Sequence, residues 1–303
     1  IIANSAIGVS MLLSLWLFIL YMSGHNVSES HLIYTWYATS GYFFEIGLLV
    51  DSLTIIMSSI VTFISFFVHM YSIAYMKGDP SFKRFFIYTN FFTFSMLFIV
   101  FSNNFLQLFI GWELVGLSSY LLIGFWYNKP SAVSANLKAF VVNRVGDIGL
   151  LLGVILILIT SNSLNYTDFF DKLPLLKDDT VNLLGYHIKL LPFIALLLFI
   201  GAAAKSAQIP LHFWLPDSME GPTPISALIH AATMVTAGIF MVARLSPLYD
   251  LSGYVLDLIL VIGVSTALFM GMVALVQNDI KRIIAYSTIS QLGYMTAALG
   301  ASY

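Results

Sequence analysis

Long apolar runs, separated by short polar segments, recur along the whole chain. An apolar run of about 18 or more residues is typical of a helix that spans a membrane. The pattern predicts nine such helices, at 1–22, 47–75, 82–102, 104–127, 133–161, 189–209, 223–248, 254–277 and 280–300. We therefore expect an all-α fold, in which residues 1–303 form one polytopic transmembrane helical bundle.

The basic residues between these segments predict an orientation. They gather in three connectors: Lys77, Lys83 and Arg84 after the second segment, Lys129 after the fourth, and Lys281 with Arg282 after the eighth. If every segment crosses once, these connectors lie on one side. Lys and Arg are enriched in cytoplasmic loops, so that side is predicted to be the inside, and residue 1 lies there too.

The composition agrees with a membrane protein. The chain is 59% hydrophobic and 9% charged, whereas soluble domains carry about 25% charged residues. So few charges cannot cover a water-facing surface, which makes the lipid bilayer the expected environment. No basic stripe points to a nucleic-acid partner.

The sequence contains no cysteine, which excludes disulfides, cysteine-ligated iron–sulfur clusters and zinc–thiolate sites. It also lacks an HExxH or paired-histidine motif, and no segment resembles a flavin, haem or nicotinamide site. We expect no metal and no cofactor in this chain.

Two charges lie where a charge is costly. Glu113 is near the middle of the fourth segment, and a charge at the bilayer centre costs at least about 2.5–3.5 kcal/mol. Lys205 follows a long apolar run, and Pro210 interrupts its helix shortly afterwards because proline lacks a backbone N–H. Broken helices in membranes line cavities. A Glu113–Lys205 pair that opens and closes is therefore a candidate proton switch; a neutral hydrogen-bonded acid and a lysine that snorkels to the interface are the alternatives.

Further ionisable groups accompany this pair. His230 lies within the seventh segment and suits a proton relay, although a buried neutral histidine is the alternative. Arg144 and Asp147 are three residues apart on the fifth segment and can meet on one helix face, with Lys138 nearly two turns earlier. An interfacial salt bridge and a role in conduction or coupling between subunits are both open. Lys281 could point inward from the start of the last segment.

Four long motifs resemble one family, the antiporter-like membrane subunits of NADH:quinone oxidoreductase (respiratory complex I), in particular its chain 5, which bacteria call chain L. They are "SNNFLQLFIGWELVGLSSYLLIGFW", "NLKAFVVNRVGDIG", "AAKSAQIPLHFWLPDSMEGPTPISALIHAATMVTAGIF" and "QNDIKRIIAYSTISQLGYM". The resemblance covers nearly the whole chain. It implies an antiporter-like fold with a broken helix near Lys205. The family's first helix and its C-terminal part, with a second broken helix and a long lateral helix, have no counterpart here, so we expect the sequence to be a piece of a longer protein.

The resemblance also implies roles for the same residues. Glu113 and Lys205 match the proton-handling pair of a half-channel, and His230 and Lys281 match residues of a central hydrophilic axis. Asp147, with Arg144, matches a site that couples neighbouring subunits.

The function that the resemblance implies is proton translocation in the membrane arm of NADH:quinone oxidoreductase, an H⁺-translocating enzyme complex. NADH, FMN, iron–sulfur clusters and quinone would bind to other subunits. The expected partners are the other membrane subunits, especially the neighbouring antiporter-like one. The expected location is the bacterial inner membrane, with the mitochondrial inner membrane as the other possibility. The alternative functions are a subunit of a multisubunit Na⁺/H⁺ antiporter or of a membrane-bound hydrogenase, and a structural membrane scaffold.

Overall fold

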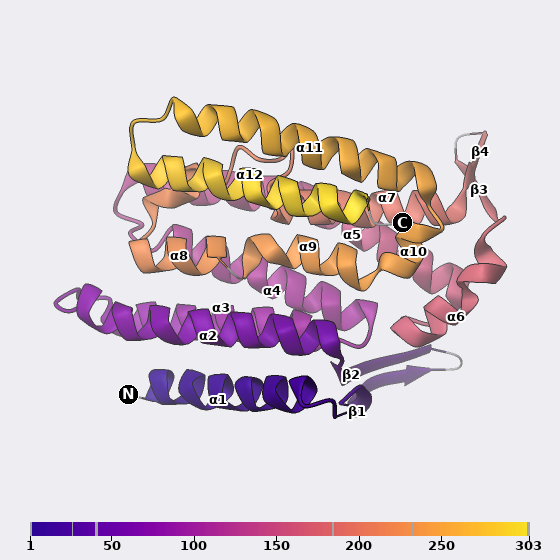
Figure 1. Cartoon of the computed structure of the whole chain (residues 1–303), viewed down its shortest axis with the longest axis horizontal. Helices are drawn as coiled ribbons and strands as arrows, with labels where there is room; N and C mark the ends of the chain where they lie inside the picture. The colour runs from indigo at the N-terminus through magenta and orange to yellow at the C-terminus, as the bar shows by residue number, and fades with distance from the viewer. Residues whose placement is uncertain (1, 26, 40–41, 184, 232, 302–303) are drawn as a thin grey trace.

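Helices lying side by side make up most of the computed structural model (Figure 1), which describes residues 2–25, 27–39, 42–183, 185–231 and 233–301. The helices are α1 (Ile2–Met22), α2 (Ser52–Tyr75), α3 (Phe82–Val100), α4 (Phe105–Ile123), α5 (Pro130–Ser161), α6 (Tyr166–Leu176), α7 (Leu190–Lys205), α8 (Thr223–Ala231), α9 (Met234–Arg244), α10 (Ser246–Asp250), α11 (Gly253–Leu275) and α12 (Ile280–Gly300), with a 3₁₀ helix η1 (Asp217–Glu220). The predicted all-α polytopic fold is confirmed: each of the nine predicted segments contains a helix.

By length and composition, six helical stretches among the described residues can cross a membrane. They are Ile2–Met22, Ser52–Tyr75, Phe105–Ile123, Pro130–Ser161, Thr223–Arg244 and Gly253–Leu275. Large apolar side chains are exposed along these helices, for example Ile60 and Phe67 on α2. Such a surface fits lipid rather than water, so the chain is a multi-pass membrane protein.

Two β-hairpins were not predicted. Strands β1 (Glu29–Thr39) and β2 (Tyr42–Val50) pair antiparallel, and so do β3 (Thr180–Leu183) and β4 (Tyr186–Lys189). The second predicted segment, 47–75, was therefore too long at its start, because the apolar residues of β2 run directly into those of α2. The helix begins only after Asp51, whose carboxylate accepts a hydrogen bond from the Thr54 N–H at 2.9 Å, as an N-cap residue does.

The seventh predicted segment, 223–248, is not one helix. The structure divides it into α8, α9 and α10, and residue 232, between α8 and α9, lies outside the described residues. The long connector after the fifth segment also contains structure that the apolar pattern missed, namely α6 and the β3–β4 hairpin.

The two ends of the bundle differ in charge. Both hairpins and α6 lie at one end, and the connectors α2–α3, α4–α5 and α11–α12 lie at the opposite end (Figure 1). These three connectors carry the basic residues that predicted the orientation, so the prediction that they share one side is confirmed. We call their end of the bundle the inner end and the hairpin end the outer end.

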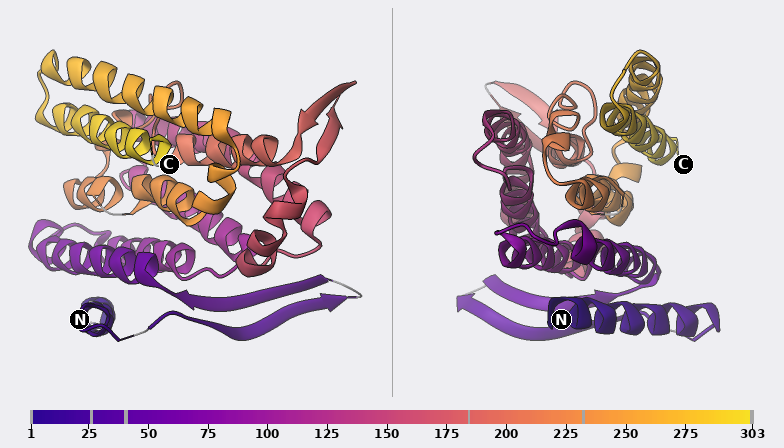
Figure 2. Two further views of the ribbon diagram at one scale, coloured as in Figure 1. Left: turned by 45° about the vertical axis from the view of Figure 1, so that its right-hand side comes forward. Right: turned by 90° about the vertical axis from the view of Figure 1, so that its left-hand side faces the viewer.

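Helix pairs build the core around the central helices. α11 packs on α12, α5 on α7, α3 on α4 and α1 on α2, and Figure 2 shows α1 at the edge of the bundle. The α5–α7 contact is close because α5 presents glycine to it: a Cβ at Gly153 would lie 2.7 Å from Leu198 Cδ2. This packing holds α5 and α7 at a fixed distance beside α4.

A buried ion pair ties α9 to the start of α2. Arg244, at the end of α9, donates to both carboxylate oxygens of Asp51 and to Thr54 Oγ1. Desolvation acts to raise the pKa of Asp51, but the hydrogen bonds and charge of Arg244, together with Thr54, outweigh it, so this pKa lies below the ordinary 3.8. A carboxylate with a lowered pKa stabilises the fold fully above its ordinary pKa, and this contribution is lost as the pH falls through the lowered value.

We expect Arg244→Met to destabilise the protein by about 2 kcal/mol. Loss of one partner of a fully buried pair costs about 3–5 kcal/mol, and the value is smaller here because the Asp51 side chain is 26% exposed. Thermal unfolding of the detergent-purified protein at pH 7 measures it. Lys172→Met, which removes an interfacial lysine that donates to the Ser161 carbonyl, is the control and should shift the midpoint less. An equal shift in both variants would contradict a special role for the pair.

Candidate functional site

The break after α7 places Lys205 inside the bundle. α7 ends at Lys205, the backbone at Ala207 is left-handed (φ 51°), and the chain then runs in turns to η1. Polar groups freed by the break find partners: the Trp214 indole N–H donates to the Ala204 carbonyl at 3.0 Å, and the Ile209 N–H donates to Thr266 Oγ1 at 3.1 Å. The predicted break near Lys205, before Pro210, is therefore present, and it is stabilised by α11 as well as by the chain that follows it.

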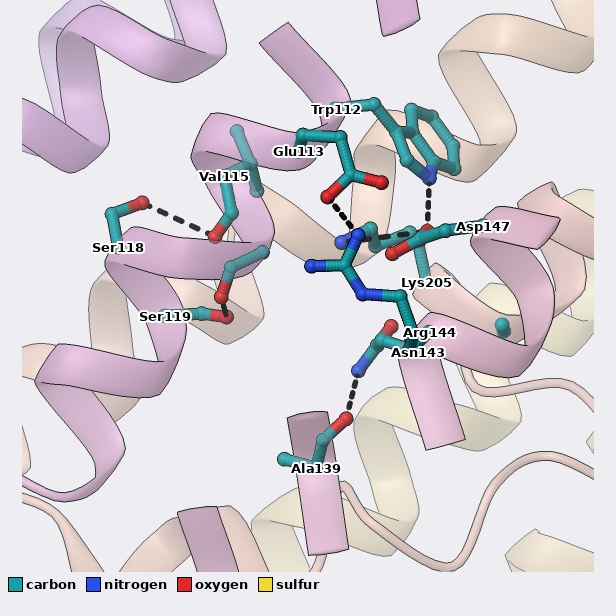
Figure 3. Close-up of polar contacts among 12 residues, drawn as sticks. Trp112, Glu113, Val115, Ser118, Ser119, Ala139, Asn143, Arg144, Asp147 and Lys205 are labelled. Carbon is teal, nitrogen blue, oxygen red and sulfur yellow. Dashed lines mark hydrogen bonds and ion pairs between the residues drawn. The ribbon is translucent and has the colours of Figure 1, made fainter. Parts of the chain in front are cut away.

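The Lys205 side chain is fully buried, and its amine has no hydrogen-bond partner among the described residues. Its Nζ lies 3.9 Å from Asp147 Oδ1 and 5.8 Å from the centre of the Trp112 ring. A Cβ at Gly116 would lie 2.9 Å from the same nitrogen. Glycine at 116 thus leaves the space that the amine occupies, between α4 and α5 (Figure 3).

Asp147 is held in place from α4. Its side chain is 4% exposed, and its Oδ1 accepts a hydrogen bond from the Trp112 indole N–H at 2.8 Å. The same oxygen faces Lys205 (Figure 3). Because the indole is rigid and buried, it fixes which carboxylate oxygen is presented to the amine.

Glu113 pairs with Arg144, not with Lys205. The Arg144 guanidinium donates to Glu113 Oε2, and the two side chains are 42% and 23% exposed. The direct Glu113–Lys205 pair expected from the sequence is absent from the ion pairs of the described residues, although Glu113 is close enough to act electrostatically on Lys205. Arg144 and Asp147 share a helix, as predicted, but each bonds across to a different helix rather than to the other.

The four charges form one network in which the lysine is the loosest member. Glu113–Arg144 and Asp147–Trp112 are hydrogen-bonded, whereas Lys205 is near its acid without a hydrogen bond. A buried charge with few partners is costly to hold, so small movements change its energy strongly. The amine can approach Asp147. If Arg144 moves away from Glu113, the amine can approach Glu113 instead. This is a geometry that can load and unload a proton.

Two further predicted residues, His230 and Lys281, lie beside η1 and not in this network. His230, 6% exposed, lies 3.3 Å from Ser218 Oγ through its Nε2. Lys281 donates to the carbonyls of Met219 and Gly221 at 3.1 and 3.3 Å. Both residues therefore contact the η1 segment or its ends.

Lys138 does not join Arg144 and Asp147. It forms an ion pair with Asp217 of η1, at 2.6 Å. Nearby, a cavity of about 260 Å³ is lined by Trp126, Lys129, Pro216, Met219, Glu220, Asp279, Lys281 and Arg282. We call this cavity the inner mouth. It brings charged residues of three distant segments together at the inner end.

Sequence reasoning missed Trp112, Gly116 and Ser218. The first two are four residues apart on α4, one turn, so they share the face that Glu113 borders; that spacing was a signal for which residues surround the acid. Ser218 gave no signal, because its role depends on a turn that brings η1 back to α8.

Gly116→Ala should impair the site without changing any charge. The added methyl would lie 2.9 Å from the Lys205 amine, closer than a Cβ can approach another atom, and we expect the lysine to be displaced from Asp147. Proton transport in energised membrane vesicles measures the effect, with Gly253→Ala as the control, because a Cβ at Gly253 meets no atom within 4 Å. Unchanged proton transport in Gly116→Ala would show that transport does not depend on the position of the Lys205 amine beside Asp147.

Similarity to known proteins was found along nearly the whole chain. A family model described as "NADH:quinone oxidoreductase/Mrp antiporter, TM" matches residues 102–303, and one described as "NADH-Ubiquinone oxidoreductase (complex I), chain 5 N-terminus" matches residues 36–86.

Among curated proteins, the chain is 55% identical to NADH-quinone oxidoreductase subunit L of Neisseria meningitidis serogroup A, over 98% of this chain and 44% of that protein. It is 51% identical to NADH-ubiquinone oxidoreductase chain 5 of Dictyostelium citrinum, over 88% of this chain and 40% of that protein. The chain thus spans less than half the length of these relatives.

Solved structures share the fold. The Mrp complex from Dietzia sp. DQ12-45-1b matches with a TM-score of 0.85 at 28% identity, over 98% of this chain and 31% of that one. An archaeal membrane-bound sulfane sulfur reductase matches with a TM-score of 0.82 at 22% identity, over 98% of this chain and 58% of that one.

Proposed function

Because the chain belongs to the NADH:quinone oxidoreductase/Mrp antiporter family of membrane subunits, we propose that it translocates protons in the membrane arm of an NADH:quinone oxidoreductase. The identity of 55% to a subunit L, against 28% to an Mrp subunit, supports this assignment over a Na⁺/H⁺ antiporter. The match of residues 36–86 to the chain 5 N-terminus points the same way. We further propose that residues 1–303 form one integral membrane antiporter-like domain.

The observation that carries the proposal is the buried, unbonded amine of Lys205 between two acids. When Lys205 lies against Asp147, the protonated amine is stabilised by the carboxylate. When Arg144 moves away from Glu113, the freed carboxylate also holds the proton on the amine. When Arg144 pairs with Glu113 again and Asp147 is neutralised, the amine loses its counter-charges and the proton leaves. Moving one proton across about 200 mV requires about 4.6 kcal/mol. The loss of a counter-charge from a buried ion costs a similar amount, about 3–5 kcal/mol.

The other residues extend the path. Protons enter or leave at the inner mouth beside Lys281, and the Ser218–His230 contact leads from η1 into the bundle. The Lys138–Asp217 pair holds η1 against α5. Arg144 is 42% exposed, so a neighbouring membrane subunit can contact it and, through Glu113, alter the network. In this way Arg144 and Asp147 couple the chain to its neighbour.

The chain itself carries out no redox chemistry under this proposal. NADH, FMN, iron–sulfur clusters and quinone belong to other subunits of the complex. The partners are the other membrane subunits, in particular the adjacent antiporter-like one. We propose the bacterial inner membrane as its location, since the subunit L relative with 55% identity is bacterial.

Inverted membrane vesicles from a strain that depends on this protein test the proposal. NADH should drive quinone reduction and build a proton gradient, measured with a quenched fluorescent amine. An imposed sodium gradient without NADH should build none. A sodium-driven proton gradient in the absence of NADH would instead support the antiporter function. Vesicles that lack the protein are the control.

A further inference from the structure

The buried face of α2 is polar, which is unusual for a helix of this hydropathy. Six buried side chains follow one another at helical spacing: Thr54, Ser58, Thr62, Ser65, His69 and Ser72. At 100° per residue they fall within an arc of about 80°. The opposite face of α2 carries exposed apolar residues such as Ile60 and Phe67. We call the six residues the hydroxyl face of α2.

His69 is the titratable member of this face. It is 1% exposed, and its Nδ1 lies 2.7 Å from the Ser65 carbonyl oxygen, so Nδ1 carries the proton of the neutral ring. Its Nε2 is then an acceptor, and it has no partner among the described residues. Ser65 Oγ lies 3.3 Å from His69 Nδ1 and 2.8 Å from Thr93 Oγ1 of α3.

Two contacts fix how α2 lies along α8 and α9. At the inner end, Tyr75 Oη lies 3.4 Å from Thr223 Oγ1, and at the outer end Arg244 binds Asp51. α2 therefore runs antiparallel to α8 and α9, which Figure 1 shows beside it. His69, six residues from Tyr75, is about 9 Å along the helix, and the same distance from Thr223 along α8 leads to Ile229. The two buried histidines, His69 and His230, are therefore at nearly the same depth on helices that pack together.

Both helices carry buried polar atoms without a partner in the inner half of the bundle. Besides His69 Nε2, they are Ser226 Oγ and His230 Nδ1, both on α8 and both buried. Buried polar atoms are nearly always hydrogen-bonded, through water where no protein partner exists. Small hydroxyl residues also let helices pack closely, but close packing does not account for two histidine nitrogens that lack a partner.

α2 packs on α1, α3 and α8, and His230 is the titratable residue that α8 carries. α1 has no charged residue. On α3, Lys83 and Arg84 lie at the inner end, and Arg84 turns to the Phe125 carbonyl. Asp51 and Arg244 lie at the outer end of the hydroxyl face. Among the described residues no charged side chain forms a hydrogen bond or ion pair with His69.

We propose that the seam between α2 and α8 is a proton-exchange site, in which His69 receives a proton from the His230 side and passes it along the hydroxyl face of α2 towards Asp51 and Arg244. The proposal rests on the proton-translocating function above and gives that function an outward branch. It assigns roles to His69, Ser65 and Thr62.

The transfer balances without any redox change. A proton arrives at Nε2 and makes the ring an imidazolium, and the Nδ1 proton leaves to Ser65 Oγ, which releases its own proton towards Thr62 Oγ1. Each hydroxyl of the face that accepts a proton releases its own to the next, until a proton leaves to water at the outer end. Thr93 Oγ1 stays a hydrogen-bond partner of Ser65. The ring rotates to restore the first tautomer. Along the axis, hydroxyls four residues apart are about 6 Å apart, so water must bridge them. Water must therefore enter the space between the hydroxyl groups of this face.

Proton pumping in the whole complex tests the proposal. His69→Gln keeps a polar side chain that cannot carry a proton near neutral pH, and Thr62→Val removes one hydroxyl at constant shape. Both should keep NADH oxidation and lose pumping. Ser59→Ala is the matched control: Ser59 is buried on α2 outside the hydroxyl face and bonds to the Ser14 and Ile55 carbonyls. It should pump normally.

Lys205→Met, measured in the same vesicles, separates the two proposals. If it loses pumping while His69→Gln and Thr62→Val pump normally, the α2 branch is wrong and the proposed function stands. If all three variants pump normally, the proposed function is wrong, and the α2 branch, which rests on that function, is wrong too. Should His69→Gln fail to assemble, Thr62→Val decides.

Cysteine labelling gives a readout independent of pumping. The chain contains no cysteine, so Thr62→Cys is its single thiol in the assembled complex. Thiols react as thiolates, which form in water and not in lipid. A small methanethiosulfonate reagent should label Thr62→Cys and leave Ile60→Cys, on the lipid-facing side, unlabelled. Failure to label Thr62→Cys would show that water does not reach the hydroxyl face of α2, and this would overturn the proposal.

Discussion

Lys205→Met should abolish proton flux through this subunit while the complex still assembles and oxidises NADH. Methionine has nearly the length of lysine and no charge, so it fits the fully buried site without a desolvation cost. Asp147 keeps its hydrogen bond from Trp112. What is lost is the amine that holds the proton. We expect flux through this subunit to fall about a hundredfold, the low end of what a positioned proton-transfer group contributes.

The measurement is the number of protons moved per NADH oxidised in inverted vesicles. Lys172→Met is the control, because Lys172 lies on α6 outside the network and donates to the Ser161 carbonyl. It should behave as the unaltered protein. Equal pumping in Lys205→Met and the control would refute the role of the amine.

Asp147→Asn should have the second largest effect. Asparagine keeps the shape and can still accept from Trp112, but it removes the only acid within 4 Å of Lys205 among the described residues. The buried ammonium then has no counter-charge in ion-pair contact among the described residues, and loss of such a partner costs about 3–5 kcal/mol if the amine stays charged. We expect the site to avoid this cost by releasing the proton, so that folding is retained and pumping is lost.

Asp147→Glu is the matched variant, since it restores the charge at a slightly different position. It should recover part of the pumping that Asp147→Asn loses. Assembly of the complex, followed by native gel electrophoresis, separates the two roles of the acid. If Asp147→Asn fails to assemble, Asp147 is a structural ion pair and its place in the path is wrong.

Much of the fold was predictable from hydrophobic periodicity, because lipid requires long apolar helices with satisfied backbones. Helices α11 and α12 begin and end close to their predicted limits. The hairpins were not predictable in this way. Residues 42–50 are as apolar as the helix that follows, and only the Asp51 cap separates them. The division between α8 and α9 likewise has no proline or charge at the point where it occurs, whereas the one between α9 and α10 falls at Arg244 and just before Pro247.

The residues that form the site were predictable from the sequence, but which of them pair with one another was not. Glu113 and Lys205 stand out because charge is rare at membrane depth, and Pro210 shows where the helix breaks. Which acid faces the lysine depends on how α4, α5 and α7 rotate against one another. That rotation is set by contacts such as Trp112–Asp147 and by the space at Gly116, which residue spacing alone does not reveal. Arg144 could reach Asp147 on its own helix, yet it pairs across to α4.

The double variant Glu113→Gln/Lys205→Met tests the central claim most directly, through the protons moved per NADH oxidised in it and in both single variants. Residues that act as one unit give non-additive losses. If both groups serve one proton path, the double variant should lose no more pumping than Lys205→Met alone. Losses that multiply would show two independent paths and would contradict the account, as would normal pumping in both single variants.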